Sequence, residues 1–232
     1  MDGAAAAQEL GRQGRHGREQ PRWVCLDVGE TLIDETRVWA VWADMLGLPY
    51  LTLAAAIGAT IAEGNPHQSV FDFLGVDDWQ RLAPEVERRY GGFQAEDLYP
   101  DALPALDALR AEGCSLAVIA NQPAQRAAEL VALGVTPDVL AMSDAMGVAK
   151  PDPAFFEQVL ARCWNPRPAD LAYVGDRVDN DVRPAAAAGL RAVWLRRGPW
   201  GVVQRDDEHR AHLVVDSLAE MVERLDEVWA AG

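Results

Sequence analysis

The sequence predicts an α/β fold built on a parallel sheet, and three observations lead to this prediction. Short apolar runs alternate with segments of helical periodicity, which is the pattern of successive β-α-β units. The chain has 232 residues, half of them apolar, which suffices for one sizeable core and a small inserted domain. One stretch, 35–98, shows helical periodicity and no strand alternation. We therefore predict a three-layer, Rossmann-like α/β core with an all-helical cap.

The N-terminal part predicts a tail, a first strand and the beginning of the cap. Residues 1–21 have no apolar periodicity, so we expect a disordered tail. The apolar run 23–26 is followed by Asp27, which is typical of a buried parallel strand. Asp34 then offers a cap for the first helix of the insert. Further helical patterns lie at 51–63 and 78–90.

The rest of the chain alternates regularly between strands and helices. Apolar runs predict strands at 115–119, 138–141, 171–174 and 191–195. Helical periodicity predicts helices at 101–112, 123–133, 153–162, 185–188 and 218–228. A capping box of Ser217 and Glu220 begins the last helix. The predicted units are a tail at 1–21, a core at 22–34 and 99–232, and a cap at 35–98.

Composition and charge exclude several classes of partner. No apolar run approaches the ~20 residues of a membrane-spanning helix. The net charge of −15 disfavours nucleic acid and anionic membranes as partners. The chain has three widely spaced cysteines and no signal-peptide pattern, so we expect a reducing, cytoplasmic setting. An anionic substrate would need a local positive charge or a metal ion, and the oligomeric state stays open.

Acidic and basic side chains follow the predicted strands at the edge where ligands of parallel sheets bind. Asp27 follows the first strand, and Asp176 and Asp181 follow the strand at 171–174. Carboxylates that lie close together repel one another, and Mg²⁺ relieves this repulsion. Lys150, the only lysine among 21 basic residues, adds a compact positive charge. The set predicts a Mg²⁺ site at which a carboxylate attacks a small anionic substrate.

Four motifs in this order and placement resemble the haloacid dehalogenase (HAD) superfamily over about residues 22–228. They are Asp27-Val28-Gly29-Glu30-Thr31-Leu32, Ala120-Asn121, Lys150-Pro151, and Gly175-Asp176 through Asp181. The resemblance implies that Asp27 is the nucleophile, that Lys150 orders the anions, and that a helical cap follows the first motif. It also implies a Mg²⁺-dependent phosphatase that acts on a small phosphorylated metabolite. The implied metal ligands are Asp27, the Val28 carbonyl, Asp176 and Asp181.

The chain departs from the HAD phosphatase pattern at two positions. Gly29 stands where phosphatases carry the aspartate that protonates the leaving oxygen and later activates water. Ala120 stands where a hydroxyl side chain usually contacts the phosphoryl group. Glu30 is a candidate stand-in for the missing acid at the substrate site. Asn121 and Arg37 are further candidates for substrate binding.

Two alternative functions follow from these departures. The first is a metal-binding HAD-like protein with little or no turnover, because Gly29 and Ala120 replace catalytic groups. The second is a dehalogenase-like hydrolase, which the presence of Gly175-Asp176 and Asp181 disfavours. Schiff-base chemistry from the cap, as in phosphonatases, is excluded because 35–98 contains no lysine.

Overall fold

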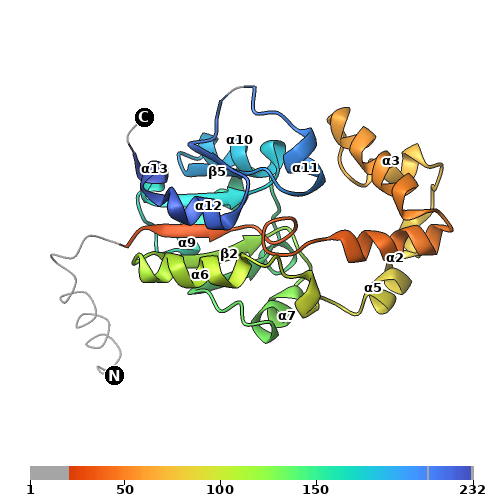
Figure 1. The fold of residues 1–232 in the computed structure, drawn as a ribbon, viewed down its shortest axis with the longest axis horizontal. Helices are drawn as coiled ribbons and strands as arrows, with labels where there is room; N and C mark the ends of the chain where they lie inside the picture. The colour runs from red at the N-terminus through yellow and green to blue at the C-terminus, as the bar shows by residue number, and fades with distance from the viewer. Residues whose placement is uncertain (1–20, 208, 231–232) are drawn as a thin grey trace, which may run out of the picture.

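Six parallel strands form the centre of the molecule, in the order β3-β2-β1-β4-β5-β6 (Figure 1). The computed structural model describes residues 21–207 and 209–230, so the predicted tail lies outside the described residues except for Pro21. The strands are β1 Trp23–Leu26, β2 Ser115–Ala120, β3 Val139–Met142, β4 Leu171–Gly175, β5 Arg191–Leu195 and β6 Leu213–Val215. This sheet confirms the predicted α/β class.

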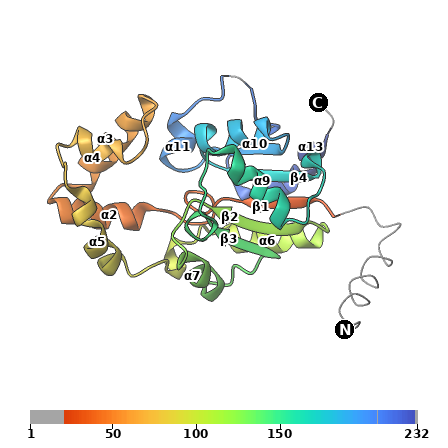
Figure 2. The same ribbon diagram turned by 180° about the vertical axis from the view of Figure 1, so that it is seen from behind.

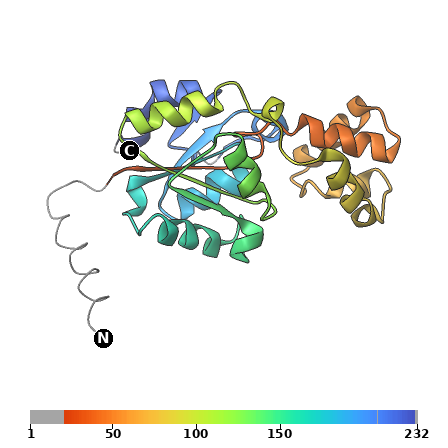
Figure 3. The ribbon, with the colours of Figure 1, turned by 90° about the horizontal axis from the view of Figure 1, so that it is seen from below.

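Helices cover both faces of the sheet, which gives three layers (Figure 3). Side chains that alternate along β1 divide between two cores: Val24 and Leu26 face one, and Cys25 faces the other. The first core is closed by α6 Ala102–Ala111, α7 Arg126–Ala132, α12 Leu218–Glu223 and α13 Leu225–Trp229. The second is closed by α9 Pro153–Arg162 and α10 Arg183–Ala187 (Figure 2). Because both faces are covered, the strands read as continuous apolar runs in the sequence.

A helical insert follows β1 and lies beyond the carboxyl end of the sheet (Figure 1). Its helices are α2 Thr36–Leu46, α3 Tyr50–Ala62, α4 Ser69–Phe73, η1 Trp79–Arg81, α5 Ala83–Tyr90 and η2 Ala95–Asp97. They enclose a separate core around Trp39, Trp42 and Phe71. Trp200 of α11 Gly198–Val203 joins this core from the α/β part, and α11 packs against α3.

The insert leaves and rejoins the α/β core at one place, which we call the hinge (residues 32–34 and 97–99). Ile33 and Leu98 form an antiparallel bridge. On either side of it, the Asp34 amide donates to the Asp97 carbonyl at 2.7 Å, and the Tyr99 amide donates to the Leu32 carbonyl at 3.0 Å. The two chain segments therefore enter and leave the helical insert as a paired ribbon.

Several short elements have no counterpart in the predicted pattern. They are α4, η2, α8 Ser143–Met146, η3 Pro168–Asp170, the π-helix η4 Val178–Val182, α11 and β6. All have six residues or fewer, which is too short for hydrophobic periodicity to show. The predicted last helix is broken at Arg224 into α12 and α13. Within the described residues no single helix is long and apolar enough to span a membrane, although α2 and α3 pass that test together as a pair bent by 111°.

Candidate active site

Three aspartates meet at the carboxyl edge of the sheet. Asp27 follows β1 and Asp176 follows β4, and these two strands are hydrogen-bonded neighbours. Asp181 returns to the same place from the π-helix η4. One carboxylate oxygen from each of the three lies within 4.8 Å of the others, and all three residues are buried. The structure therefore brings together the three acids that the sequence places at this edge.

Lys150 lies between two of these acids. Its Nζ is 2.7 Å from Asp27 Oδ1 and 2.6 Å from Asp181 Oδ1, and its side chain has no exposed surface. Burial alone would lower the pKa of Lys150, but the charges of Asp181 and Asp27 outweigh this effect and raise it. The lysine is therefore held as a cation against the carboxylate expected to attack.

Asn121 fixes the backbone of Lys150. Its Oδ1 accepts from the Lys150 amide at 2.8 Å, and its Nδ2 donates to the Lys150 carbonyl at 2.9 Å. Asn121 lines the cavity described below, but its amide group positions the lysine instead of pointing free toward a substrate.

Gly175 makes room for Asp181. A Cβ at position 175 would overlap the Asp181 carboxylate, so this contact requires glycine. The second carboxylate oxygen of Asp181 accepts from the Arg177 amide at 3.0 Å. Asp181 is thus held on one side by Lys150 and on the other by the loop after β4.

Asp176 gives the acid cluster its capacity for a metal ion. Its Oδ2 is buried and has no hydrogen-bond partner among the described residues. Burial, together with the charges of Asp181 and Asp27, raises the pKa of Asp176 well above its usual range. A divalent cation would relieve both penalties, and a donor set made only of carboxylate oxygens suits Mg²⁺. The residues present therefore fit the ion that the sequence predicts.

The carbonyl of Val28, the expected backbone ligand, is directed elsewhere. It accepts from the amides of Thr31, Leu32 and Ile33 at 3.2, 2.9 and 2.9 Å, and so closes the turn after β1. Val28 does not line the cavity, whereas Gly29 does. The Val28 carbonyl is thus engaged within the turn after β1.

Glu30 lies at the edge of the site with both carboxylate oxygens engaged. They accept from the Tyr99 hydroxyl at 2.5 Å and from the Glu35 amide at 3.1 Å. Burial raises the pKa of Glu30, although the Tyr99 hydrogen bond acts against the shift. Its backbone adopts a left-handed φ of 51°, which turns the chain back toward the hinge. Glu30 therefore ties the turn after β1 to the hinge.

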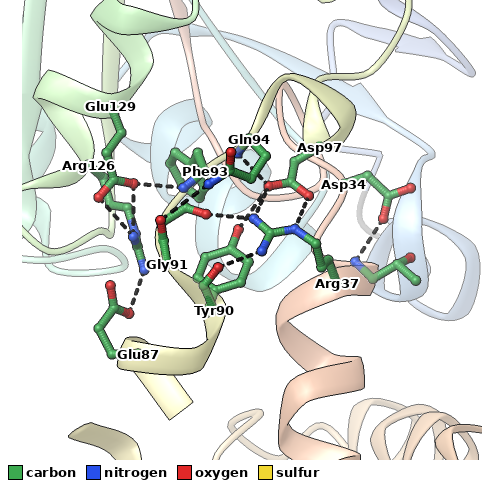
Figure 4. A network of polar contacts seen from close by, with 12 residues as sticks. Asp34, Arg37, Glu87, Tyr90, Gly91, Phe93, Gln94, Asp97, Arg126 and Glu129 are labelled. Carbon is green, nitrogen blue, oxygen red and sulfur yellow. Dashed lines mark hydrogen bonds and ion pairs between the residues drawn. The ribbon is translucent and has the colours of Figure 1, made fainter. Parts of the chain in front are cut away.

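Arg37 lies beside Asp97 of the hinge (Figure 4). It is not among the residues that line the cavity. Its guanidinium donates to both carboxylate oxygens of Asp97, at 2.8 and 2.5 Å, and to the carbonyls of Tyr90 and Gly92. These four hydrogen bonds are all made within the protein. The structure gives Arg37 a role in joining the two ends of the insert, and it does not place Arg37 at the acid cluster.

A cavity of about 370 Å³ lies between the acid cluster and the helical insert. Asp27, Lys150 and Asp176 form its floor. Its far wall is largely aromatic and includes Trp39, Trp42, His67, Phe71, Trp79 and Trp200, together with Val38 and Gln68. A larger hollow of about 730 Å³ lies at the opposite, amino edge of the strands, beside Arg22 and Asp170, but no metal-ligating cluster lies there within the described part of the chain. We therefore place the functional site at the smaller cavity.

Glu35 is a site residue that the sequence does not reveal. It lines the cavity at the start of α2, and its carboxyl group lies against Gly29. Burial raises the pKa of Glu35 to about 8, with further contributions from the charges of Glu30 and Asp27. No motif marks it, because the turn after β1 and the hinge decide its position and neither leaves a periodic pattern in the sequence.

Comparisons with known proteins agree with this geometry. Residues 21–189 match the family model described as haloacid dehalogenase-like hydrolase. The chain is 35% identical to a phosphoserine phosphatase of Thermus thermophilus, over 82% of this chain and 74% of that protein. It is 31% identical to a glyceraldehyde 3-phosphate phosphatase of Methanopyrus kandleri, over 69% and 72%. Among solved structures, the HAD-hydrolase YfnB of Bacillus subtilis bound to magnesium shares the fold with a TM-score of 0.68 at 18% identity, over 90% of this chain and all of that one.

Proposed function

The chain belongs to the haloacid dehalogenase-like hydrolase family, and from that premise we propose that it is a Mg²⁺-dependent phosphatase of small phosphorylated metabolites. The observation that carries this proposal is the arrangement of Lys150 between Asp27 and Asp181 beside the unpartnered Asp176 oxygen. Relatives that cover most of this chain are named as phosphatases of glyceraldehyde 3-phosphate, phosphoserine and phosphoglycolate.

The residues support a two-step transfer. A carboxylate oxygen of Asp27 attacks phosphorus, the bond to the leaving oxygen breaks, and an aspartyl phosphate forms. Lys150 holds Asp27 in place and offsets the negative charge that gathers around the phosphoryl group. Asp27 and Asp176, with Asp181 beside them, would hold Mg²⁺, which neutralises charge on the phosphoryl oxygens. Water then hydrolyses the aspartyl phosphate and regenerates Asp27.

The cavity wall supports a substrate whose organic part is apolar. His67 lies edge-on to Trp39 and Trp200, with ring centroids 6.3 and 5.9 Å away. Burial and the nearby Arg177 lower the pKa of His67 to about 4, so its ring is neutral near pH 7. The two arginines of the lining are already paired: Arg126 with Glu87 and Glu129, and Arg177 with Asp179. A second anionic group on the substrate would therefore lack a ready cation, while an apolar group would meet aromatic rings.

A metal-binding protein with little turnover is the second candidate, and Gly29 is the observation that favours it. Phosphate release from a panel of phosphate monoesters, with Mg²⁺ and with chelator, separates the two candidates. We expect Mg²⁺-dependent release by the wild-type chain and none by Asp27→Asn. If no substrate gives Asp27-dependent release while Mg²⁺ still binds, the phosphatase proposal is wrong and the second candidate stands. Halide release that persists in chelator would instead support a dehalogenase-like hydrolase.

A further inference from the structure

Position 29 lacks a side chain, but the space beside it is filled. A Cβ built on Gly29 would lie 2.5 Å from Oε1 and 2.9 Å from Cδ of Glu35, which is closer than real side chains approach. Gly29 does not have a left-handed φ, so its backbone does not demand glycine. A side chain at position 29 would therefore require the Glu35 carboxyl group to move from its present place.

The turn after β1 brings Glu35 to this place. The three amides that converge on the Val28 carbonyl fold residues 28–33 into a tight turn. The Glu35 amide is then anchored on the Glu30 carboxylate at 3.1 Å. The Glu35 side chain consequently faces the same cavity as Asp27 and Lys150, with Gln122 and Trp39 beside it.

Two other carboxylates of the site, those of Asp181 and Glu30, are held by strong donors. Asp181 contacts Lys150 and the Arg177 amide, and Glu30 contacts the Tyr99 hydroxyl and the Glu35 amide. The groups that lie beside the Glu35 carboxyl, Gln122 and Trp39, are neutral. A carboxyl group in such surroundings can keep a proton and give it up.

We propose that Glu35 is the general acid and base of this site, and that it supplies from the first turn of the insert the carboxyl group that position 29 lacks. This inference rests on the proposed phosphatase function. It assigns the acid to a residue eight positions after the nucleophile instead of the adjacent Glu30.

The proton balance of the two steps is complete with Glu35 alone. When phosphorus passes from the leaving oxygen to Asp27, the protonated Glu35 carboxyl gives its proton to that oxygen, and the alcohol departs. The Glu35 carboxylate then takes a proton from the water that attacks the aspartyl phosphate. Inorganic phosphate leaves, and both Asp27 and protonated Glu35 are restored. The raised pKa of Glu35 agrees with its being protonated near neutral pH at the start of this cycle.

The first experiment compares Glu35→Gln with the wild-type chain and with Glu157→Gln, an exposed glutamate of α9. With an alkyl phosphate, kcat/KM of Glu35→Gln should fall by about 10²–10⁴-fold, the usual contribution of general acid–base catalysis. With 4-nitrophenyl phosphate, whose leaving group departs without a proton, Glu35→Gln should still release one nitrophenolate per chain in a burst. The trapped aspartyl phosphate should then appear in the intact mass as one added phosphoryl group. Glu157→Gln should behave as the wild-type chain.

The second experiment moves the carboxyl group to position 29. Glu35→Ala vacates the space, and adding Gly29→Asp fills it with a new carboxyl group. The kcat/KM of the double variant for an alkyl phosphate should be at least tenfold higher than that of Glu35→Ala. Gly29→Asp alone should give no more activity than the double variant, because its side chain would displace the Glu35 carboxyl group.

The outcomes separate this inference from the proposed function. If Glu35→Gln hydrolyses alkyl phosphates at the wild-type rate while Asp27→Asn is inactive, the assignment of Glu35 is wrong and the phosphatase function stands. The assignment is also wrong if Glu35→Gln is slow but shows no burst with the aryl ester, and relocation to position 29 restores nothing. If the wild-type chain itself shows no Asp27-dependent hydrolysis, both proposals are wrong.

Discussion

Two buried side chains near Asp27 differ in charge at neutral pH: Lys150 stays protonated and positive, whereas Glu35 is protonated and neutral. Burial alone would lower the pKa of Lys150, yet Asp181 and Asp27 raise it, so its ammonium form persists. Burial raises the pKa of Glu35 to about 8, and the carboxylates of Glu30 and Asp27 add to this shift. At neutral pH Asp27, the proposed nucleophile, therefore has a cation on one side and a neutral carboxyl group in the same cavity. This is the distribution of charge and protons that attack on a phosphate monoester requires.

The raised pKa of Glu35 predicts that kcat/KM declines on the alkaline side of the pH profile. Because the acid must be protonated when the leaving group departs, kcat/KM for an alkyl phosphate should fall as pH rises through about 8. Mg²⁺ at Asp27 would offset one of the charges that raise this pKa, while the effect of burial would persist. The charged or titratable groups that share the cavity are Asp27, Glu30, Arg126, Lys150, Asp176, Arg177 and His67.

A pH series of kcat/KM on the wild-type chain and Glu35→Gln measures this decline. The wild-type chain should show the fall, and Glu35→Gln should lack it over the same range. A fall of equal size in both proteins would assign the decline to another of the groups around the cavity.

A largely buried ion pair between Arg37 and Asp97 holds α2 against the hinge. The Asp97 side chain is 3% exposed and the Arg37 side chain 27%. Burial would raise the pKa of Asp97, but the hydrogen bonds from Arg37 and the Gln94 amide outweigh it and leave the pKa lowered. Arg37 also lies over the Tyr90 ring, 4.0 Å from its centroid. One arginine thus joins the start of α2 to the segment that returns to the core.

Arg37→Met should destabilise the fold strongly, because it leaves the Asp97 charge buried without its main partner. We expect a loss on the order of 3 kcal/mol in the free energy of unfolding, measured with urea. Arg88→Met is the matched control, because Arg88 pairs with Glu85 on the surface and such pairs contribute about 0–1 kcal/mol. Equal losses in the two variants would contradict the role of the hinge. If Arg37→Met instead folds with unchanged stability and shows a raised KM, Arg37 would be assigned to substrate binding.

The sequence predicted the elements whose buried residues recur along the chain. It did not predict the elements that one or two specific contacts hold in place. The strand at 171–174 is buried along its whole length and was clear from its residues alone. The acids Asp27, Asp176 and Asp181 were predicted to meet because they follow strands. Lys150 was predicted to join them because the Lys150-Pro151 motif precedes a helix in the same order of motifs, and its being the only lysine supported this. Trp200 and Glu35 could not be placed in this way. A six-residue helix and a turn closed by one carbonyl position them, and neither has a period.

In the whole molecule, the helical insert and the α/β core share the cavity beside the acid cluster between them. The core supplies the charged floor, and the insert with Trp200 supplies the aromatic wall. Arg126 at the start of α7 reaches across to Glu87 of α5 at 2.6 Å, so the two parts are also joined by an ion pair (Figure 4). Under the proposed function, surfaces from both parts would therefore set the substrate preference.

This division predicts a preference for apolar phosphate monoesters. Butyl or phenyl phosphate should exceed phosphoglycolate and phosphoserine in kcat/KM by at least about tenfold, since each buried methylene contributes about 0.8 kcal/mol. Trp200→Ala should reduce this preference, mainly through a higher KM for the apolar esters. Trp164→Ala is the control, because Trp164 is 65% exposed and does not line the cavity. Faster hydrolysis of the carboxylated esters by the wild-type chain would contradict the apolar wall as the determinant of substrate choice.

Lys150 makes the site open to selective chemical labelling. An amine-directed acylating reagent meets one side-chain target in the entire sequence, and in the folded chain that target is enclosed by two carboxylates. Acylation of Lys150 therefore requires the ion pairs to part and the site to open, and its rate reports how often this happens. Intact-mass spectra of the unaltered protein can follow the reaction. Slower labelling in the presence of Mg²⁺ or a phosphate analogue would then reveal occupancy of the site before any natural substrate is identified.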